Sequence, residues 1–171
     1  MQTNRDNIAA FAETHAEEND AFVQFVRNAD GKKIDDLVAA INAAVEPAID
    51  CTECGACCKT LMINVTPAEA TKTADFLGVS LNDFKEKYIE ESQQGQLIMS
   101  QMPCHFLAGS RCTVYEQRFT ECREFPHLHR GNFKDRMFGT MIHYAMCPII
   151  FNVVETLKIA TGFKATSSEL R

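Results

Sequence analysis

The sequence predicts a mainly α-helical fold, a small single domain whose helices pack around an irregular, cysteine-rich, metal-binding core that includes one short hairpin. Three observations predict it. Apolar residues recur at three- and four-residue spacing in several segments. Eight cysteines lie between residues 51 and 147, where turn residues interrupt that pattern. A length of 171 residues, of which 46% are hydrophobic and 23% charged, suffices to bury a core.

Residues 1–49 contain no cysteine and form a predicted N-terminal helical segment. Apolar side chains from Ile8 to Val26 indicate one amphipathic helix or two, ending near residues 28–31. A second stripe runs from Ile34 to Val45, and Pro47 stops it. We expect a helical hairpin that covers the core of the rest, with a partner-binding arm as the alternative.

The predicted cysteine-cluster domain spans residues 50–163. Thr66, Pro67 and Glu69 predict a helix to about Leu77, ended by Gly78. A second helix should start at Ser80, with these residues inward: Leu81, Phe84, Tyr88 and Ile89.

Further along the chain, residues 96–102 favour a short strand, and residues 104–115 a tight hairpin that turns at 108–110. Residues 116–123 suggest one or two helical turns. A last helix should run from Pro148 to about Thr161, before Gly162, and residues 164–171 form a predicted polar tail.

The charge balance excludes some classes of partner. There are 17 Lys+Arg against 23 Asp+Glu, a formal net charge of −6, which argues against nucleic acid and anionic membranes. The polar start resembles no signal peptide. The longest apolar stretch, about Tyr144 to Val154, is roughly half of the ~20 residues that a membrane helix needs. We therefore expect a cytoplasmic protein with no nucleic-acid and no membrane partner; the sequence identifies no protein partner.

Eight cysteines are unusual for such a chain. Without a secretion signal, metal binding or redox chemistry is favoured over disulfides. All eight are candidate metal ligands: Cys51, Cys54, Cys57, Cys58, Cys104, Cys112, Cys122 and Cys147.

Cys51, Cys54 and Cys57, at steps of three residues, can wrap one metal centre, and Gly55 allows a sharp turn between them. The adjacent Cys58 must point elsewhere. Eight thiolates divide naturally into two tetrahedral sites; one site plus spare buried thiols is the alternative. Cys147 lies in an apolar run, where a core thiol is an equally ordinary explanation.

Basic and imidazole side chains lie near these cysteines. Lys59, Arg111 and Arg123 each neighbour a cysteine in sequence and could offset thiolate charge, or could be solvated. A histidine among His105, His127 and His129 could replace a thiolate, although eight cysteines suffice. His15 and His143 are expected within helices, and residues 127–136 as a solvated basic loop rather than an anion site.

The spacing does not decide between zinc and iron. Structural zinc sites usually have a second C-x-x-C knuckle, which this chain lacks. The C-x-x-C-x-x-C run with a distant Cys147-Pro148 has features of iron–sulfur ligation.

The order of motifs resembles the YkgJ-like cysteine-cluster family, named for CxxCxxCC. The matching residues are Cys51 to Cys58, Pro103 to Leu107, Cys112 to Tyr115, Arg118, and Cys122 to Pro126. The resemblance implies zinc or iron chelation by these cysteines and no settled reaction.

Our first hypothesis is a metal-binding protein with one or two zinc or iron centres, in which Arg118 and Arg123 support the ligands and Arg118 also holds Glu116 or Glu121. The main alternative is an iron–sulfur electron carrier or an enzyme with an open cluster site. A thiol-redox protein is the third, although one redox pair does not need eight cysteines. The sequence does not decide whether the protein is an enzyme.

Overall fold

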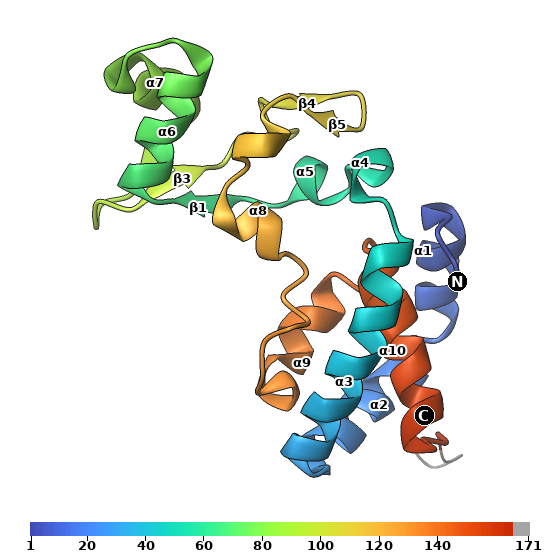
Figure 1. Ribbon diagram of the computed structural model, residues 1–171. Helices are drawn as coiled ribbons and strands as arrows, with labels where there is room; N and C mark the ends of the chain where they lie inside the picture. The colour runs from blue at the N-terminus through green and yellow to red at the C-terminus, as the bar shows by residue number, and fades with distance from the viewer. Residues whose placement is uncertain (166–171) are drawn as a thin grey trace. The chain divides into compact units, whose positions relative to one another are not determined.

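The computed structural model describes residues 1–165, and in this range it contains ten α-helices and two small antiparallel sheets (Figure 1). The prediction of a mainly α fold with a short hairpin is confirmed. The chain divides into two compact units. Unit 1 is Met1–Ile49 with Pro126–Arg171, and unit 2 is Asp50–Phe125. Residues 126–165 therefore group with the N-terminal helices, whereas the sequence had placed them with the cysteines.

Unit 1 begins with three helices, α1 (Arg5–Thr14), α2 (Ala16–Asn28) and α3 (Gly31–Val45). Of the two alternatives for the first segment, one helix or two, the structure has two. His15 lies at their junction rather than within a helix. Asp30 caps α3 by accepting hydrogen bonds from two backbone amides. A 3₁₀ turn, η1 (Glu46–Ala48), follows α3 where Pro47 was expected to stop it.

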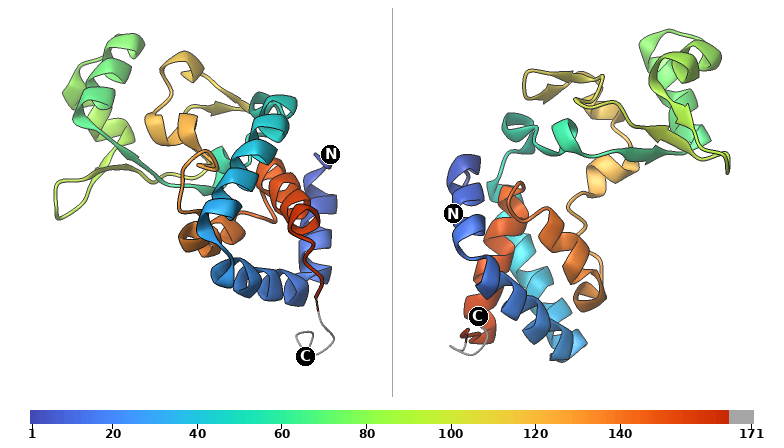
Figure 2. Two further views of the ribbon diagram at one scale, coloured as in Figure 1. Left: turned by 60° about the horizontal axis from the view of Figure 1, so that its bottom comes forward. Right: turned by 180° about the vertical axis from the view of Figure 1, so that it is seen from behind.

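The rest of unit 1 is α9 (Phe133–Ile142) and α10 (Pro148–Thr161). Helix α10 lies beside α3 in every view of Figures 1 and 2 and ends at Gly162 as predicted. Helix α9 replaces part of the expected solvated loop at 127–136. Its signal was Phe133, Met137 and Thr140, all buried on one face.

Polar contacts fasten these helices to one another. Asp35 on α3 accepts hydrogen bonds from the backbone amides of Asn132 and Phe133, both at 2.8 Å, and so caps α9. The buried Lys158 ammonium on α10 bonds Glu18 and Asn19 of α2 at 2.8 and 2.7 Å. The N-terminal helices therefore cover a core that they share with α9 and α10 within unit 1.

Unit 2 begins with two single-turn helices, α4 (Cys51–Cys54) and α5 (Cys57–Thr60), in a region expected to be an irregular loop. Helices α6 (Pro67–Leu77) and α7 (Leu81–Tyr88) follow as predicted, with Gly78 ending α6. Phe84 is fully buried, as expected, but Leu81 is exposed because it occupies the first turn of α7.

Three short strands form one sheet in the order β1-β3-β2, comprising β1 (Ile63–Val65), β2 (Glu90–Glu91) and β3 (Leu97–Met99). Only β3 was predicted. The expected hairpin is β4 (Leu107–Ala108) and β5 (Arg111–Cys112). The helical turns predicted at 116–123 are present as the turn η2 (Tyr115–Gln117) and helix α8 (Thr120–Glu124).

The core of unit 2 lies between the β-sheet, α6, α7 and the segments around the hairpin. Its buried members are Val65, Ala70, Ala74, Phe84, Leu97, Met99, Phe106, Val114 and Phe119. Three cysteines pack against the edge of this core: Cys104, Cys112 and Cys122. The predicted tail at 164–171 falls almost entirely outside the described residues. No helix among the described residues is long and apolar enough to cross a bilayer.

Candidate metal centre

The CxxCxxCC segment is held in place by a glycine. Gly55 ends α4 in the left-handed conformation, with φ +59°, and its amide bonds the Cys51 carbonyl. A Cβ atom at this position would lie 3.0 Å from the Ser110 carbonyl oxygen. Gly55 therefore lets the segment turn and also lets it approach the backbone of the β4–β5 hairpin, which carries Cys112.

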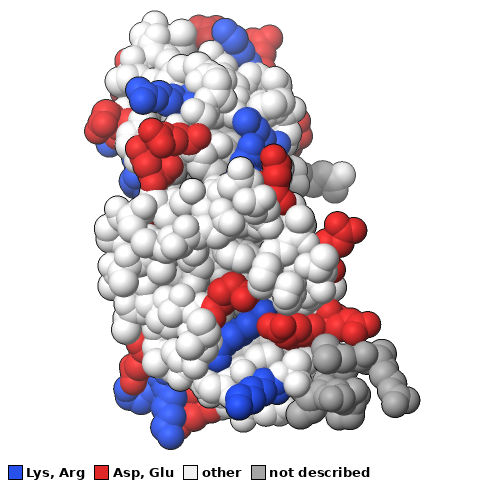
Figure 3. All heavy atoms as spheres, turned by 90° about the vertical axis from the view of Figure 1, so that its right-hand side faces the viewer, with Lys and Arg blue, Asp and Glu red and all other residues white. Residues whose placement is uncertain are grey.

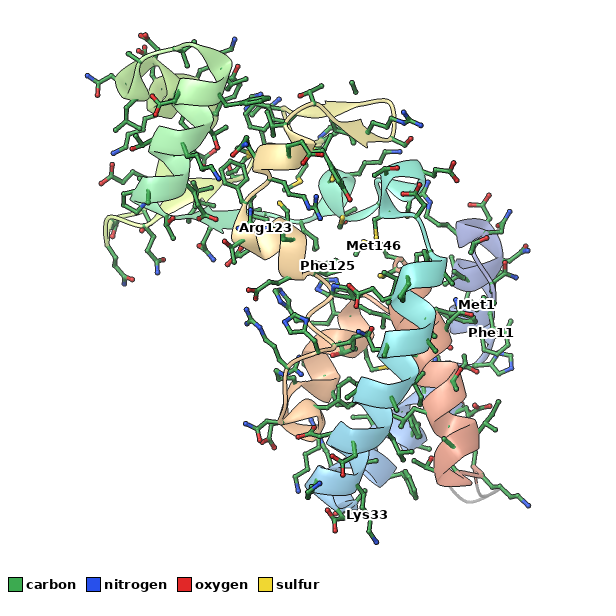
Figure 4. The ribbon with its side chains drawn as sticks, in the orientation of Figure 1. Met1, Phe11, Lys33, Arg123, Phe125 and Met146 are labelled. Carbon is green, nitrogen blue, oxygen red and sulfur yellow. The ribbon has the colours of Figure 1, made fainter. Side chains whose placement is uncertain are left out.

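Cys58 and Cys104 are connected through the backbone. The Cys104 amide donates to the Cys58 carbonyl at 2.8 Å, so the loop before the hairpin runs beside α5. The Cys104 thiol in turn lies 3.7 Å from the Met99 sulfur on β3. Figure 4 draws sulfur atoms around α5, α8 and the hairpin.

Four thiols of unit 2 form one group: Cys58, Cys104, Cys112 and Cys122. Burial is the main cause that raises the pKa of Cys104, Cys112 and Cys122, and a negative charge on Cys58 raises the pKa of each further. Cys104, Cys112 and Cys122 also pack against the same core, and the Cys104 amide bonds the Cys58 carbonyl. We refer to these four residues as the thiol cluster.

Burial affects these thiols unequally. Desolvation raises the pKa of Cys104 and Cys112, and it raises the pKa of Cys122 to about 12. Cys58 differs, since a hydrogen bond from Cys57, whose sulfur lies 4.0 Å away, lowers its pKa to about 7 against the effect of burial. Three members of the cluster are therefore neutral at pH 7, while Cys58 is partly ionised.

The donor set suits a borderline or soft metal ion. Four thiols from four separate segments can supply the tetrahedral sulfur ligation that zinc and iron accept. Within residues 1–165, however, no three Cys, His, Asp or Glu side chains already converge as a ligand set. The cluster is thus a group of neighbouring thiols that side-chain rotation would have to close on one point.

Two cations lie near the cluster. Lys59 lowers the pKa of Cys58, and Arg118 acts in the same direction on Cys112. Arg118 also stacks on the Tyr115 ring, 3.9 Å from its centroid, and donates to the Tyr115 carbonyl. The expectation that Arg118 would hold Glu116 or Glu121 is therefore wrong in part, because Glu121 binds Asn64 instead.

The other two expected cations face different partners. Arg123, labelled on α8 in Figure 4, donates to the Arg118 carbonyl and to the Thr120 hydroxyl. Hydrogen bonds from the Thr52 hydroxyl and amide lower the pKa of Asp50, and the charge of Arg111 lowers it further. Arg123 thus supports the loop before α8, and Arg111 lies beside the start of α4.

The remaining cysteines fall into two groups. Cys51, Cys54 and Cys57 belong to unit 2, where Cys51 is exposed and the other two are half-buried. Cys147 belongs to unit 1, where it is buried and precedes α10. The eight cysteines, all within residues 1–165, form no disulfide.

The histidines lie in different parts of the chain. His105 packs edge-on against the Tyr88 ring at 5.1 Å. His127 and His129 belong to unit 1, with ring centroids 6.5 Å apart. His143 ends α9 rather than lying inside it, and burial lowers its pKa.

Sequence reasoning named Glu69 and Glu121 but missed their partners Thr120 and Asn64, and it missed the contact of Met99 with Cys104. Met99 was expected only as a member of a short strand, and Glu69 only as the last residue of a capping box. On the face drawn in Figure 3, acidic and basic side chains are interspersed, so charge does not mark a further site there.

Comparison with known proteins identifies the family. A family model described as "CxxCxxCC: Putative zinc- or iron-chelating domain" matches residues 50–147. No curated protein and no solved structure matched the chain. The match begins at the first residue of unit 2 and ends at Cys147 in unit 1. It covers 147 − 50 + 1 = 98 of 171 residues, more than half of the chain. The chain therefore belongs to the CxxCxxCC family.

Proposed function

We propose that this protein binds zinc or iron, and that the thiol cluster of Cys58, Cys104, Cys112 and Cys122 holds one divalent ion. The observation that carries the proposal is that Cys104, Cys112 and Cys122 pack against the same hydrophobic core, while the Cys104 amide bonds the Cys58 carbonyl at 2.8 Å. Metal binding displaces the thiol protons, and the positive charge of the bound ion offsets the repulsion and the cost of burial of the thiolates that result.

Charge supports one divalent ion. Four thiolates and a divalent cation carry a net charge of −2, and Lys59 and Arg118 lie where they offset it. The ligands come from α5, the loop before β4, strand β5 and α8, which are separate segments of unit 2. A bound ion would join them, so metal binding would contribute directly to the stability of unit 2.

A second centre is a separate proposal that rests on sequence. Cys51, Cys54 and Cys57 keep the three-residue spacing of metal-binding loops, and Cys147 remains a ligand candidate from the motif order.

The cysteine-rich ligand set also suits a reducing compartment, so we propose a cytoplasmic location.

The test is elemental analysis and visible absorption of full-length protein purified without oxygen. One or two zinc ions per chain and a colourless protein would support the proposal and favour a structural role. Iron with acid-labile sulfide and a brown colour would instead favour the alternative, an iron–sulfur electron carrier or enzyme. Protein that carries no metal, and takes up none when zinc or ferrous iron is added, would refute metal binding.

A further inference from the structure

Helix α8, which carries Cys122, is too short to be stable without contacts to other segments. It is five residues long, from Thr120 to Glu124, and its preceding residue Phe119 provides no side-chain cap. Helices this short are unstable in isolation, because nucleation is costly and few hydrogen bonds follow. The position of Cys122 must therefore be set by what fastens α8 to its surroundings.

Glu69 fastens α8 to α6. One of its carboxylate oxygens accepts from the Thr120 amide at 2.6 Å, at the first residue of α8. The other accepts from the Thr66 amide and hydroxyl at 2.9 and 2.8 Å, which completes the capping box of α6. Although burial opposes ionisation, these hydrogen bonds lower the pKa of Glu69 to about 2. A single charged carboxylate thus caps two helices.

Glu121 fastens α8 to β1. Its carboxylate accepts from the Asn64 backbone amide at 2.7 Å and from the Asn64 side-chain amide at 3.0 Å. Glu121 lies one residue before Cys122, and Asn64 is the middle residue of β1. The first turn of α8 is therefore attached on two sides, to a helix and to the sheet.

Cys122 depends on this attachment, because it is the ligand candidate that α8 carries. Its side chain packs against the core of unit 2, as do those of Cys104 and Cys112. A displaced α8 would therefore move one of the four thiols away from the other three.

We propose that Glu69 and Glu121 are positioning residues for the metal centre, which hold α8 so that Cys122 can complete the thiol cluster. This inference rests on the proposed function, because it requires the cluster to bind metal. Groups that orient metal ligands typically contribute about 10- to 100-fold to metal affinity.

The test is a Co²⁺ titration of the full-length protein in competition with a chromophoric chelator. Glu121→Ala and Glu69→Ala should each weaken Co²⁺ binding by about 10- to 100-fold. Glu121→Gln retains an acceptor oxygen and should recover part of the loss. Glu86→Ala, an exposed carboxylate on α7, is the matched control and should bind as the wild type does.

A second comparison separates positioning from general stabilisation. In a Cys122→Ser background the ligand that Glu121 orients is already absent, so Glu121→Ala should cause little further loss of Co²⁺ affinity. An equal loss in both backgrounds, or unchanged affinity in Glu121→Ala and Glu69→Ala, would overturn the inference while wild-type binding stands. Failure of the wild type to bind Co²⁺ would refute the proposed function itself.

Discussion

Replacing Gly55 with alanine should destabilise unit 2 more than replacing any glycine that is merely left-handed. Gly55 has φ +59°, and a Cβ there would lie 3.0 Å from the Ser110 oxygen and 3.2 Å from its Cα. The left-handed conformation costs an alanine about 1–2 kcal/mol. The contact is with backbone, which cannot rotate away, and overpacking of this kind adds about 1–3 kcal/mol. We expect a loss of about 2–5 kcal/mol in the free energy of unfolding.

Gly78→Ala is the matched control. Gly78 has φ +67° in the same unit, but a Cβ there would meet nothing within 4 Å. Gly78→Ala should therefore lower the free energy of unfolding only by the cost of the left-handed conformation, about 1–2 kcal/mol. The assay is urea denaturation of both variants and the wild type, with and without zinc. Equal losses for Gly55→Ala and Gly78→Ala would refute the close approach of the cysteine segment to the hairpin.

Two further predictions concern ionisation and charge pairing. In metal-free protein, ultraviolet thiolate absorption should show one group that titrates near pH 7, because the hydrogen bond from Cys57 lowers the pKa of Cys58. Cys58→Ser should remove this titration. Its persistence in Cys58→Ser would contradict the assignment. Lys158→Ala should destabilise unit 1 by about 3 kcal/mol in thermal or urea unfolding, since Glu18 and Glu155 lose a buried partner. Lys32→Ala, which breaks the exposed pair with Asp36, should leave stability nearly unchanged.

The sequence was most informative where local chemistry decides the structure. The capping box at Thr66 and Glu69, the stop at Gly78 and the last helix from Pro148 were all predicted, because caps and breakers act within a few residues. The strands β1 and β2 were not predicted, because each is only two or three residues long and depends on pairing with β3.

The candidate site was predicted in its residue types but not in its grouping. Eight cysteines indicated metal binding, yet spacing could not assign Cys58 to the same cluster as Cys104, Cys112 and Cys122. That assignment depends on how α5, the hairpin and α8 meet around the core of unit 2. The roles of Glu69 and Glu121 escaped notice for the same reason, because their partners lie more than 50 residues away in sequence.

Thiol alkylation mapped by peptide mass spectrometry, with and without saturating zinc, tests the central claim most directly. Zinc should slow the alkylation of Cys58, Cys104, Cys112 and Cys122 together, because metal-bound thiolates react slowly. Competition by a chelator should release all four at one rate. Zinc that leaves any of these four thiols as reactive as in the metal-free protein would contradict the assignment of a single ion to the cluster.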